Sequence, residues 1–136
     1  MARKPSGASL RAMVVGIGVD LFEVARMRRE LQGRDPGLRE ELFTPAEIAG
    51  CESTRDPMLH YAQRFAAKEA VFKALSPPPG DGASWRDIEV RGHARAREVS
   101  LHGAMKARAE ALGVRRVRLS LSRRRGLAMA SVVLDG

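Results

Sequence analysis

Apolar and polar residues alternate most clearly near the end of the chain. Val117, Leu119 and Leu121 alternate with arginine and serine residues, which predicts a strand with one apolar face. Residues 123–126 are typical of a turn, and residues 127–134 are nearly all apolar. These patterns predict a hairpin whose second strand is buried on both faces in the interior of a sheet.

Another strand is predicted near the start, where residues 13–19 form a short, apolar, β-branched run. Gly16 and Gly18 alternate within it, so one face lacks side chains and another backbone or a ligand can approach closely. Asp20 follows the run and has two interpretations. It is either the N-cap of a helix predicted over residues 23–31 or a ligand-binding carboxylate, and the sequence leaves both open.

The middle of the chain carries two strong helix-start signals. Thr44, Pro45 and Glu47 form a capping box with proline at the first helical position, which predicts a helix from residue 45. Asp56 before a proline repeats the signal and predicts a long helix over residues 57–75. This helix is rich in alanine, so neighbouring chain can approach it closely.

Shorter elements follow the long helix. Residues 76–84 contain three prolines and predict a loop that ends it. Residues 85–90 are typical of a strand, which we expect to pair with residues 96–101 through a turn at Gly92. A further helix is predicted over residues 103–112, before Gly113.

Together these elements predict an α+β fold with the central alanine-rich helix packed on antiparallel strands. The 136 residues suffice for a single domain over residues 1–136, of which residues 1–12 are expected to be a loosely ordered N-terminus. Cys51 is the only cysteine, so no intrachain disulfide can form, and no apolar run is long enough to span a membrane. We therefore expect a cytoplasmic protein with no membrane partner.

The net charge of +8 predicts an electropositive surface. Such a surface suits nucleic acid, an acidic membrane, phosphorylated small molecules or an acidic protein. Arginine runs at residues 115–116 and 123–125 motivate the hypothesis of a nucleic-acid-binding module. Four Phe, one Tyr and one Trp provide no stacking platform, which disfavours nucleic acid.

Candidate chemistry is concentrated on the long helix. Glu69 and Lys73 lie four residues apart and therefore on one face, where a base and a cation can address the same ligand. The alternative is an exposed ion pair that stabilises the helix by about 0.3–0.5 kcal/mol. Spacing alone favours this alternative.

The order of several motifs resembles one family. GIGVDLFEVARM near the start and RFAAKEAVFKAL in the long helix resemble the phosphopantetheinyl transferases of the short holo-(acyl-carrier-protein) synthase type. ELFTPAEI and WRDIEV agree with the same family less strongly. The resemblance runs from Val14 to Leu134, nearly the whole chain.

The resemblance implies Mg²⁺-dependent transfer of the phosphopantetheine arm of coenzyme A to a serine of an apo acyl carrier protein. The other product would be adenosine 3′,5′-bisphosphate. Asp20 and Glu69 would bind the metal, Lys73 would lie near the pyrophosphate, and Arg64 would contact a coenzyme A phosphate. Mg²⁺ is a hard cation that suits two carboxylates and phosphate oxygens. Glu69 would also be the candidate base, and Lys73 would stabilise the leaving phosphate.

The family also implies partners for the surface. Arg26 takes the place of a carrier-contacting arginine, while Arg28 and Arg29 either steer an acidic carrier or are ordinary solvated charges. A homotrimer with active sites between subunits is implied, and the apolar last strand gives it something to bury. The carrier would come from fatty acid, polyketide or peptide synthesis.

One departure from the family lies in Ser120-Leu121-Ser122-Arg123, where the family has serine, any residue, serine, histidine. Arg123 would bind coenzyme A phosphates with a permanent charge and a bidentate fork. If the histidine must titrate, the chain is instead a degenerate homologue that binds coenzyme A without transfer. No role is assigned to the chain's three histidines, at positions 60, 93 and 102.

Overall fold

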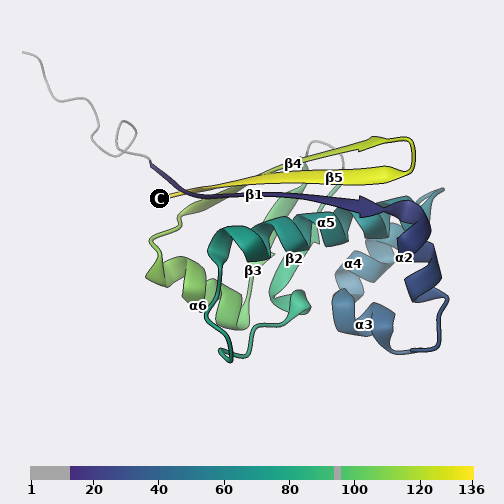
Figure 1. Cartoon of the computed structure of the whole chain (residues 1–136), viewed down its shortest axis with the longest axis horizontal. Coiled ribbons are helices and arrows are strands. Elements are labelled where there is room, and N and C mark those ends of the chain that lie inside the picture. Colours follow the sequence, from purple (N-terminus) through teal and green to yellow (C-terminus); the bar gives the residue numbers. More distant parts are fainter. Residues whose placement is uncertain (1–12, 94–95) are drawn as a thin grey trace, which may run out of the picture.

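A three-stranded antiparallel sheet carries a long helix across one face (Figure 1). The computed structural model describes residues 13–93 and 96–136, so the prediction for residues 1–12 lies outside the described residues. The sheet has the order β1-β5-β4 and the helix is α5. Their bounds are Val14–Glu23 for β1, Arg116–Arg124 for β4, Leu127–Asp135 for β5 and Pro57–Leu75 for α5.

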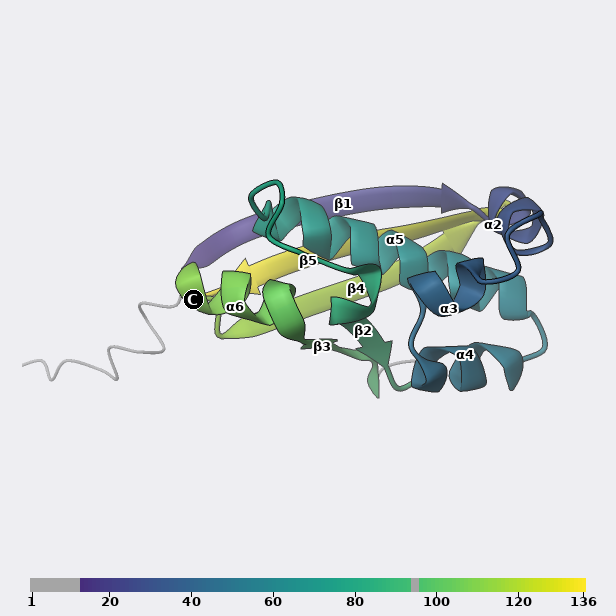
Figure 2. The same cartoon turned by 90° about the horizontal axis from the view of Figure 1, so that it is seen from below.

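The other elements surround α5 (Figure 2). Strands β2 (Ile88–Arg91) and β3 (Glu98–Leu101) form a separate antiparallel pair. Three short helices lie toward the N-terminal end of α5 and one lies at its C-terminal end. These are α2 (Val24–Leu31), α3 (Leu38–Leu42), α4 (Pro45–Glu52) and α6 (Gly103–Ala111). The predicted α+β class, with a central helix on antiparallel strands, is confirmed.

Both predicted helix starts are confirmed. The Thr44 hydroxyl accepts from the backbone N–H of Glu47, whose carboxylate accepts from the N–H of Thr44, so α4 begins with a complete capping box. The Asp56 carboxylate accepts from a backbone N–H in the first turn of α5. These caps satisfy donors that a helix leaves free at its N-terminus.

Two glycines allow β1 to lie directly on α5. A Cβ atom at Gly18 would lie 1.9 Å from the carbonyl oxygen of Ala70, and one at Gly16 would lie 2.8 Å from that of Ala74. No side chain fits at these distances. The close approach predicted from the alternating glycines is therefore confirmed, and the alanines of α5 provide the facing surface.

Asp20 is not a helix cap. Strand β1 continues through it to Glu23, with Asp20 opposite Ala130 of β5 and Glu23 opposite Leu127. The cap interpretation is wrong because β5 offers backbone partners along the whole of β1, and this ladder delays the start of α2 to Val24.

Two further predictions need correction. Residues 85–87 form a short 3₁₀ helix, η1 (Trp85–Asp87), capped by Ser84, so β2 begins only at Ile88. The last strand, β5, is central in its sheet as predicted, but it is buried within the chain on one face only. The face toward α5 is buried, whereas Ser131 on the other face is exposed.

Within the described residues, no helix is both long and apolar enough to cross a membrane.

Candidate active site

Asp20, Glu69 and Lys73 come together where β1 crosses α5. The Lys73 ammonium donates a hydrogen bond to Asp20 Oδ1 at 2.5 Å. Asp20 is almost buried, while the Lys73 side chain remains 59% exposed. Glu69 lies one helical turn before Lys73 and interacts with the same Asp20 carboxylate. The strand and the helix thus place two carboxylates and one cation at a single point.

The environment of Glu69 favours its protonated form. Burial raises its pKa, and a hydrogen bond to Asp20 and the negative charge of Asp20 raise it further, to about 7. The charges of Lys73 and Arg26 oppose this shift. The hydrogen bond and charge of Asp20 in turn raise the pKa of Lys73. Two carboxylates this close repel each other when both are ionised, so an added cation would be favourable.

The donor set fits a hard divalent cation that arrives with its substrate. Among residues 13–93 and 96–136, no three or more His, Cys, Asp or Glu side chains are grouped so as to hold a metal. Asp20 and Glu69 therefore offer two carboxylates rather than a complete cage. Mg²⁺ is commonly held in this way, with waters and substrate phosphates completing its shell.

Arg26 borders this site from α2. Its guanidinium lies 4.9 Å from the centre of the Phe22 ring and 3.5 Å from Glu30, and its charge acts on Glu69. Arg28 and Arg29 are exposed on the same helix. A groove of about 170 Å³ lies beside Arg26 between α2 and α3. Its apolar lining consists of Phe22, Met27, Leu38, Leu42 and Phe65.

Arg64 lies on a different side of α5. It precedes Glu69 by five residues, which places the two side chains about 140° apart around the helix. Arg64 is only 2% exposed, and its Nη2 donates to the carbonyl of Gly92 at 3.3 Å. Its Nε and Nη1 are buried and have no hydrogen-bond partner among the described residues. Buried charged donors of this kind favour an anion.

A small cavity gives such an anion access to Arg64. Its volume is about 190 Å³, and Gly50 and His93 line it together with residues of the β2 end. Gly50 adds no side chain to the cavity wall, where a Cβ would lie 3.4 Å from Arg64 Nη2. Neither Gly50 nor His93 was predicted from the sequence to have a role. Residues distant in sequence form this cavity, so no local motif predicts it.

Arg123 also lies away from the carboxylates. It is at the far end of β4, beside Asp56 and the arginines of the hairpin turn, in a hollow of about 290 Å³. Strand β5 separates β4 from β1, and the hollow that Arg123 lines does not include Asp20. The predicted site residues thus fall into two groups: Asp20, Glu69 and Lys73 lie together, whereas Arg64 and Arg123 line two separate hollows elsewhere.

Residues 16–129, which include every residue of both groups, match the family described as the 4′-phosphopantetheinyl transferase superfamily. The chain belongs to this superfamily. It is 42% identical over 129 residues to holo-[acyl-carrier-protein] synthase of Anaeromyxobacter sp. (strain K), covering 91% of this chain and 98% of the relative. The corresponding protein of Cutibacterium acnes is 43% identical over 124 residues, covering 91% and 100%.

Solved structures of this superfamily share the fold. The holo-[acyl-carrier-protein] synthase of Neisseria meningitidis superposes with a TM-score of 0.79 at 30% identity, covering 91% of this chain and all of that one. The Helicobacter pylori protein, solved in complex with coenzyme A, gives a TM-score of 0.72 at 28% identity over 87% and 98% of the two chains.

In this transferase a buried ion pair, which was not predicted from the sequence, lies next to Glu69 on α5. Lys68 Nζ donates to Glu47 Oε1 at 2.7 Å and to the carbonyls of Trp85 at 3.0 Å and Ile88 at 2.5 Å. Glu47 Oε2 accepts from the N–H of Val90 at 2.8 Å. Burial lowers the pKa of Lys68, while the Glu47 charge opposes the shift. The pair joins α4, α5, η1 and β2.

The periodicity of α5 contains the signal for this pair. Lys68 lies three residues after Phe65 and three before Val71, so it falls on the apolar face of the helix. A lysine there needs a buried partner. The capping-box carboxylate of Glu47 supplies one, in addition to its interaction with Thr44.

Proposed function

We propose that this chain is a phosphopantetheinyl transferase that moves the phosphopantetheine arm of coenzyme A onto a serine of an apo acyl carrier protein. The observation that supports this most directly is the meeting of Asp20, Glu69 and Lys73 in a chain of this superfamily. Related proteins are named holo-[acyl-carrier-protein] synthase, and the Helicobacter pylori structure contains coenzyme A.

The carboxylates would hold Mg²⁺, which when bound would neutralise pyrophosphate charge and align it for attack. Asp20 and Glu69 are the residues that would ligate it. Glu69 would also take up the proton that the carrier serine loses as the new phosphate ester forms, directly or through water. No covalent enzyme intermediate is needed, because such transfers rely on positioning and electrostatics.

Lys73 would stabilise the leaving phosphate of adenosine 3′,5′-bisphosphate. Its side chain is mostly exposed and its recorded partner is Asp20, so the ammonium is free to turn toward a bound pyrophosphate. An ammonium on a flexible stem suits this exchange of partners. The same movement would leave Asp20 available to a divalent cation.

Arg64 and Arg123 would anchor the phosphates of coenzyme A. The buried guanidinium of Arg64 supports this assignment, since the residue lines the adjoining cavity and its Nε and Nη1 have no hydrogen-bond partner among the described residues. Arg123 offers the bidentate fork expected for a phosphate contact. Arg64 points about 140° round α5 from Glu69, and Arg123 lines a separate hollow at the end of β4, so neither lies beside the carboxylates within one chain.

In a homotrimer, the carboxylates of one subunit could lie beside the arginines of the next. The outer face of β1 exposes three large apolar residues, Ile17 (66%), Val19 (60%) and Leu21 (55%), beside β5. A contiguous apolar face of this kind is typical of a subunit interface. We infer that each active site combines the carboxylate flank of one subunit with Arg64 and Arg123 of the next.

Mixed trimers test this arrangement. Glu69→Gln and Arg64→Gln variants are unfolded, mixed and refolded together, and transfer is assayed at a coenzyme A concentration well below the KM of the Arg64 variant, where each variant alone has little activity. If one site draws on two subunits, some sites in the mixture regain both residues and activity returns. Each variant refolded alone is the control. No recovery in a mixture shown to be trimeric would place both residues in the same subunit's site.

The carrier would dock on the basic face of α2. The positive charge of Arg26 acts on Glu69, and the exposed Arg28 and Arg29 extend the positive surface beyond Arg26. Acidic carriers would be attracted to this face, and the attraction should weaken as salt rises.

The single, buried Cys51 is consistent with the expected cytoplasmic setting, since burial raises its pKa to about 12 and keeps the thiol unreactive.

The transfer itself is tested by intact-mass spectrometry of an apo carrier incubated with the chain, coenzyme A and Mg²⁺. The expected product is one phosphopantetheine heavier, and EDTA should prevent it. Coenzyme A binding without any mass gain on several carriers would instead identify a degenerate homologue in which Arg123 does not replace histidine. Absence of coenzyme A binding would contradict the proposal altogether.

A further inference from the structure

A hollow with two aromatic side chains, which we call the aromatic hollow, lies between α5, α3 and η1. It is lined by Glu41, Phe72, Ala83, Ser84 and Trp85, and its volume is about 420 Å³. This volume lies within the range of about 300–1,000 Å³ that is typical of small-molecule sites. None of these five residues has a role in the transfer proposed above.

The aromatic hollow adjoins the candidate active site on α5. Because successive residues of a helix are about 100° apart, Phe72 lies about 60° from Glu69 around the axis, and Lys73 lies about 40° from Glu69 in the other direction. Lys73 is paired with Asp20. Glu69 therefore has the Asp20–Lys73 pair on one side and the aromatic hollow on the other. A phosphate group held by these three residues would have the hollow next to it.

The walls of the hollow are held in place by the fold itself. Ser84 caps η1, and Trp85 is the first residue of this short helix. The carbonyl of Trp85 accepts a hydrogen bond from the buried Lys68 at 3.0 Å. The Trp85 ring packs against Phe72 with centroids 5.3 Å apart and against Phe65 with centroids 5.0 Å apart. A ligand would therefore meet a preformed aromatic wall, which lowers the entropic cost of binding.

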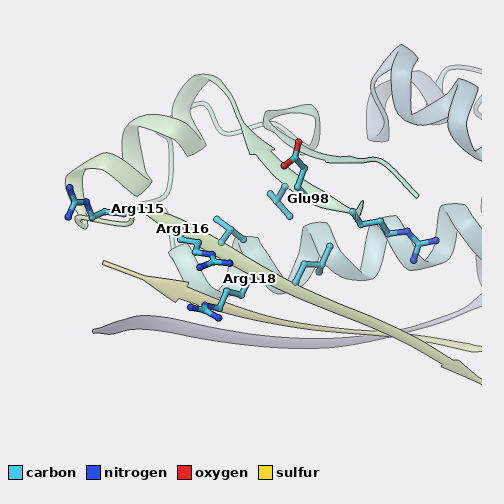
Figure 3. Close-up of a pocket in the computed structure, with 8 residues that line it drawn as sticks. Glu98, Arg115, Arg116 and Arg118 are labelled. Carbon is cyan, nitrogen blue, oxygen red and sulfur yellow. The ribbon is translucent and has the colours of Figure 1, made fainter. Parts of the chain in front are cut away.

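The charge of the hollow disfavours anions. Among the described residues, Glu41 is the only charged one that lines it, and Glu40 precedes Glu41 on α3. The larger hollow of about 570 Å³ between β3 and β4 is different, because its lining residues include four arginines and no aromatic side chain (Figure 3). A phosphate group or an acidic carrier would be repelled by Glu41. The aromatic hollow therefore suits a neutral and largely apolar group.

We propose that the aromatic hollow holds the pantetheine arm of coenzyme A, and that Phe72 and Trp85 are the residues that select this arm. The inference rests on the proposed function, in which the arm is attached to the phosphate that the carrier serine attacks. The arm is uncharged and carries two methyl groups on one carbon, two amides and a thiol. Its methyl and methylene groups would pack on the aromatic rings, and an amide N–H would donate to Glu41.

The arm fits this place better than the adenosine half of the same molecule does. Arg64 and Arg123, the proposed phosphate anchors, line hollows that share no residue with the aromatic hollow. During transfer the serine oxygen bonds to the phosphorus that bears the arm, and the bond from this phosphorus to the bridging oxygen breaks. Adenosine 3′,5′-bisphosphate leaves with that electron pair. The arm thus belongs at the Glu69 end of the ligand, beside Phe72, and the adenosine belongs at the other end.

Fluorescence tests this placement directly, because Trp85 is the only tryptophan of the chain. The full chain is titrated with coenzyme A and with adenosine 3′,5′-bisphosphate, in Mg²⁺ and without a carrier, so that no transfer occurs. Calorimetry measures the binding of each ligand. We expect coenzyme A to change the Trp85 emission as it saturates the chain. Adenosine 3′,5′-bisphosphate lacks the arm, so it should bind and leave the emission unchanged.

Two opposite changes to the hollow test its residues. Phe72→Ala removes one aromatic wall, whereas Ala83→Phe adds bulk from the loop and fills the space. Each should weaken coenzyme A binding about tenfold and leave adenosine 3′,5′-bisphosphate binding within about twofold. Leu112→Ala removes a half-buried side chain outside the hollow and should leave both affinities within about twofold. Thermal unfolding checks that the three variants fold.

Three results would overturn the proposal. The first is coenzyme A binding without any change in Trp85 emission. The second is an equal change with adenosine 3′,5′-bisphosphate, which would place the adenine in the hollow. The third is a pair of variants at Phe72 and Ala83 that weaken both ligands equally or neither. All three leave the transfer itself standing, because the carrier mass experiment reports it separately, whereas a chain that binds no coenzyme A would overturn the proposed function as well.

Discussion

Two lysine–carboxylate pairs on α5 differ in what surrounds them. Lys68 lies 2.7 Å from Glu47, and both side chains are 0% exposed. Lys73 lies 2.5 Å from Asp20, and its side chain is mostly in solvent. The pairs are similar in length and lie only five residues apart on one helix. Length alone therefore does not distinguish a structural pair from a functional one.

The difference lies in how many hydrogen bonds each ammonium makes. Lys68 donates to three acceptors, which accounts for all three of its N–H groups. Lys73 has one recorded acceptor, Asp20, and Glu69 beside it favours its protonated form. The first pair has nothing left to offer a ligand. The second leaves donors and carboxylate oxygens available, which is what a reacting site requires.

The largest expected effect is on catalysis at the exposed pair, Lys73 and Asp20, and at Glu69 beside it. Glu69→Gln and Asp20→Asn should each reduce transfer by roughly 10²–10⁴-fold, because each would remove a proposed metal ligand and Glu69→Gln would also remove the proposed base. Carrier phosphopantetheinylation followed by mass spectrometry measures the loss. Denaturant unfolding should show stability equal to or above that of the unchanged chain, since two repelling carboxylates become one. Transfer at the original rate would exclude the altered residue from the metal site.

The next largest effect is on the stability that the buried pair, Lys68 and Glu47, contributes. Lys68→Met should lower the free energy of unfolding by about 3–5 kcal/mol, because it leaves the buried Glu47 carboxylate unpaired. Urea denaturation measures this, and Lys73→Met is the matched control, expected to change stability by less than about 1 kcal/mol. Adding Glu47→Gln to Lys68→Met should restore part of the loss. Equal destabilisation by the two lysine variants would remove the distinction between the pairs.

The sequence predicted the roles of Glu69 and Lys73 better than it predicted the buried pair of Lys68 and Glu47. Glu69 and Lys73 were found because they lie four apart and because GIGVD and AAKEA occur in a family order. Helix starts were equally accessible, since a capping box is a local pattern. Asp20 was ambiguous because its role depends on β5, more than a hundred residues away, which extends β1 past it.

Long-range burial accounts for what the sequence did not predict. The cavity beside Arg64 joins α4, α5 and the end of β2. Its residues share no spacing along the chain. Lys68 was missed because lysine on a helix is usually solvated, although its place on the apolar face indicated otherwise.

A smaller effect should follow from the other flank of α5. Arg64→Gln should raise the KM for coenzyme A by roughly tenfold to a hundredfold, equivalent to losing charged hydrogen bonds of about 1.5–3 kcal/mol. Because Arg64 lies away from the carboxylates, kcat should change much less than KM. Arg86→Gln, at an exposed position outside the cavity, is the control. A fall in kcat with an unchanged KM would move Arg64 from anchoring to chemistry.

The smallest effect concerns the pH dependence of stability in the metal-free chain. Glu69 has a pKa of about 7 in the folded chain against an ordinary value of 4.5, so between these values the folded state holds a proton that the unfolded state has released. The contribution of Glu69 to stability is therefore fully present below about pH 4.5 and is lost as pH rises to about 7. Glu69→Gln should remove this component.

Urea denaturation in EDTA across pH 4 to 8 measures this component as the difference between the unchanged chain and the variant. The free energy of unfolding of the unchanged chain should fall relative to that of the Glu69→Gln variant as pH rises from about 4.5 to about 7. Asp20→Asn should reduce the shift without abolishing it, because it removes the charge of Asp20 but leaves the burial of Glu69. A difference that is constant with pH would mean that Glu69 is as well solvated as in the unfolded chain. The contrast between the two lysine pairs would then rest on exposure alone.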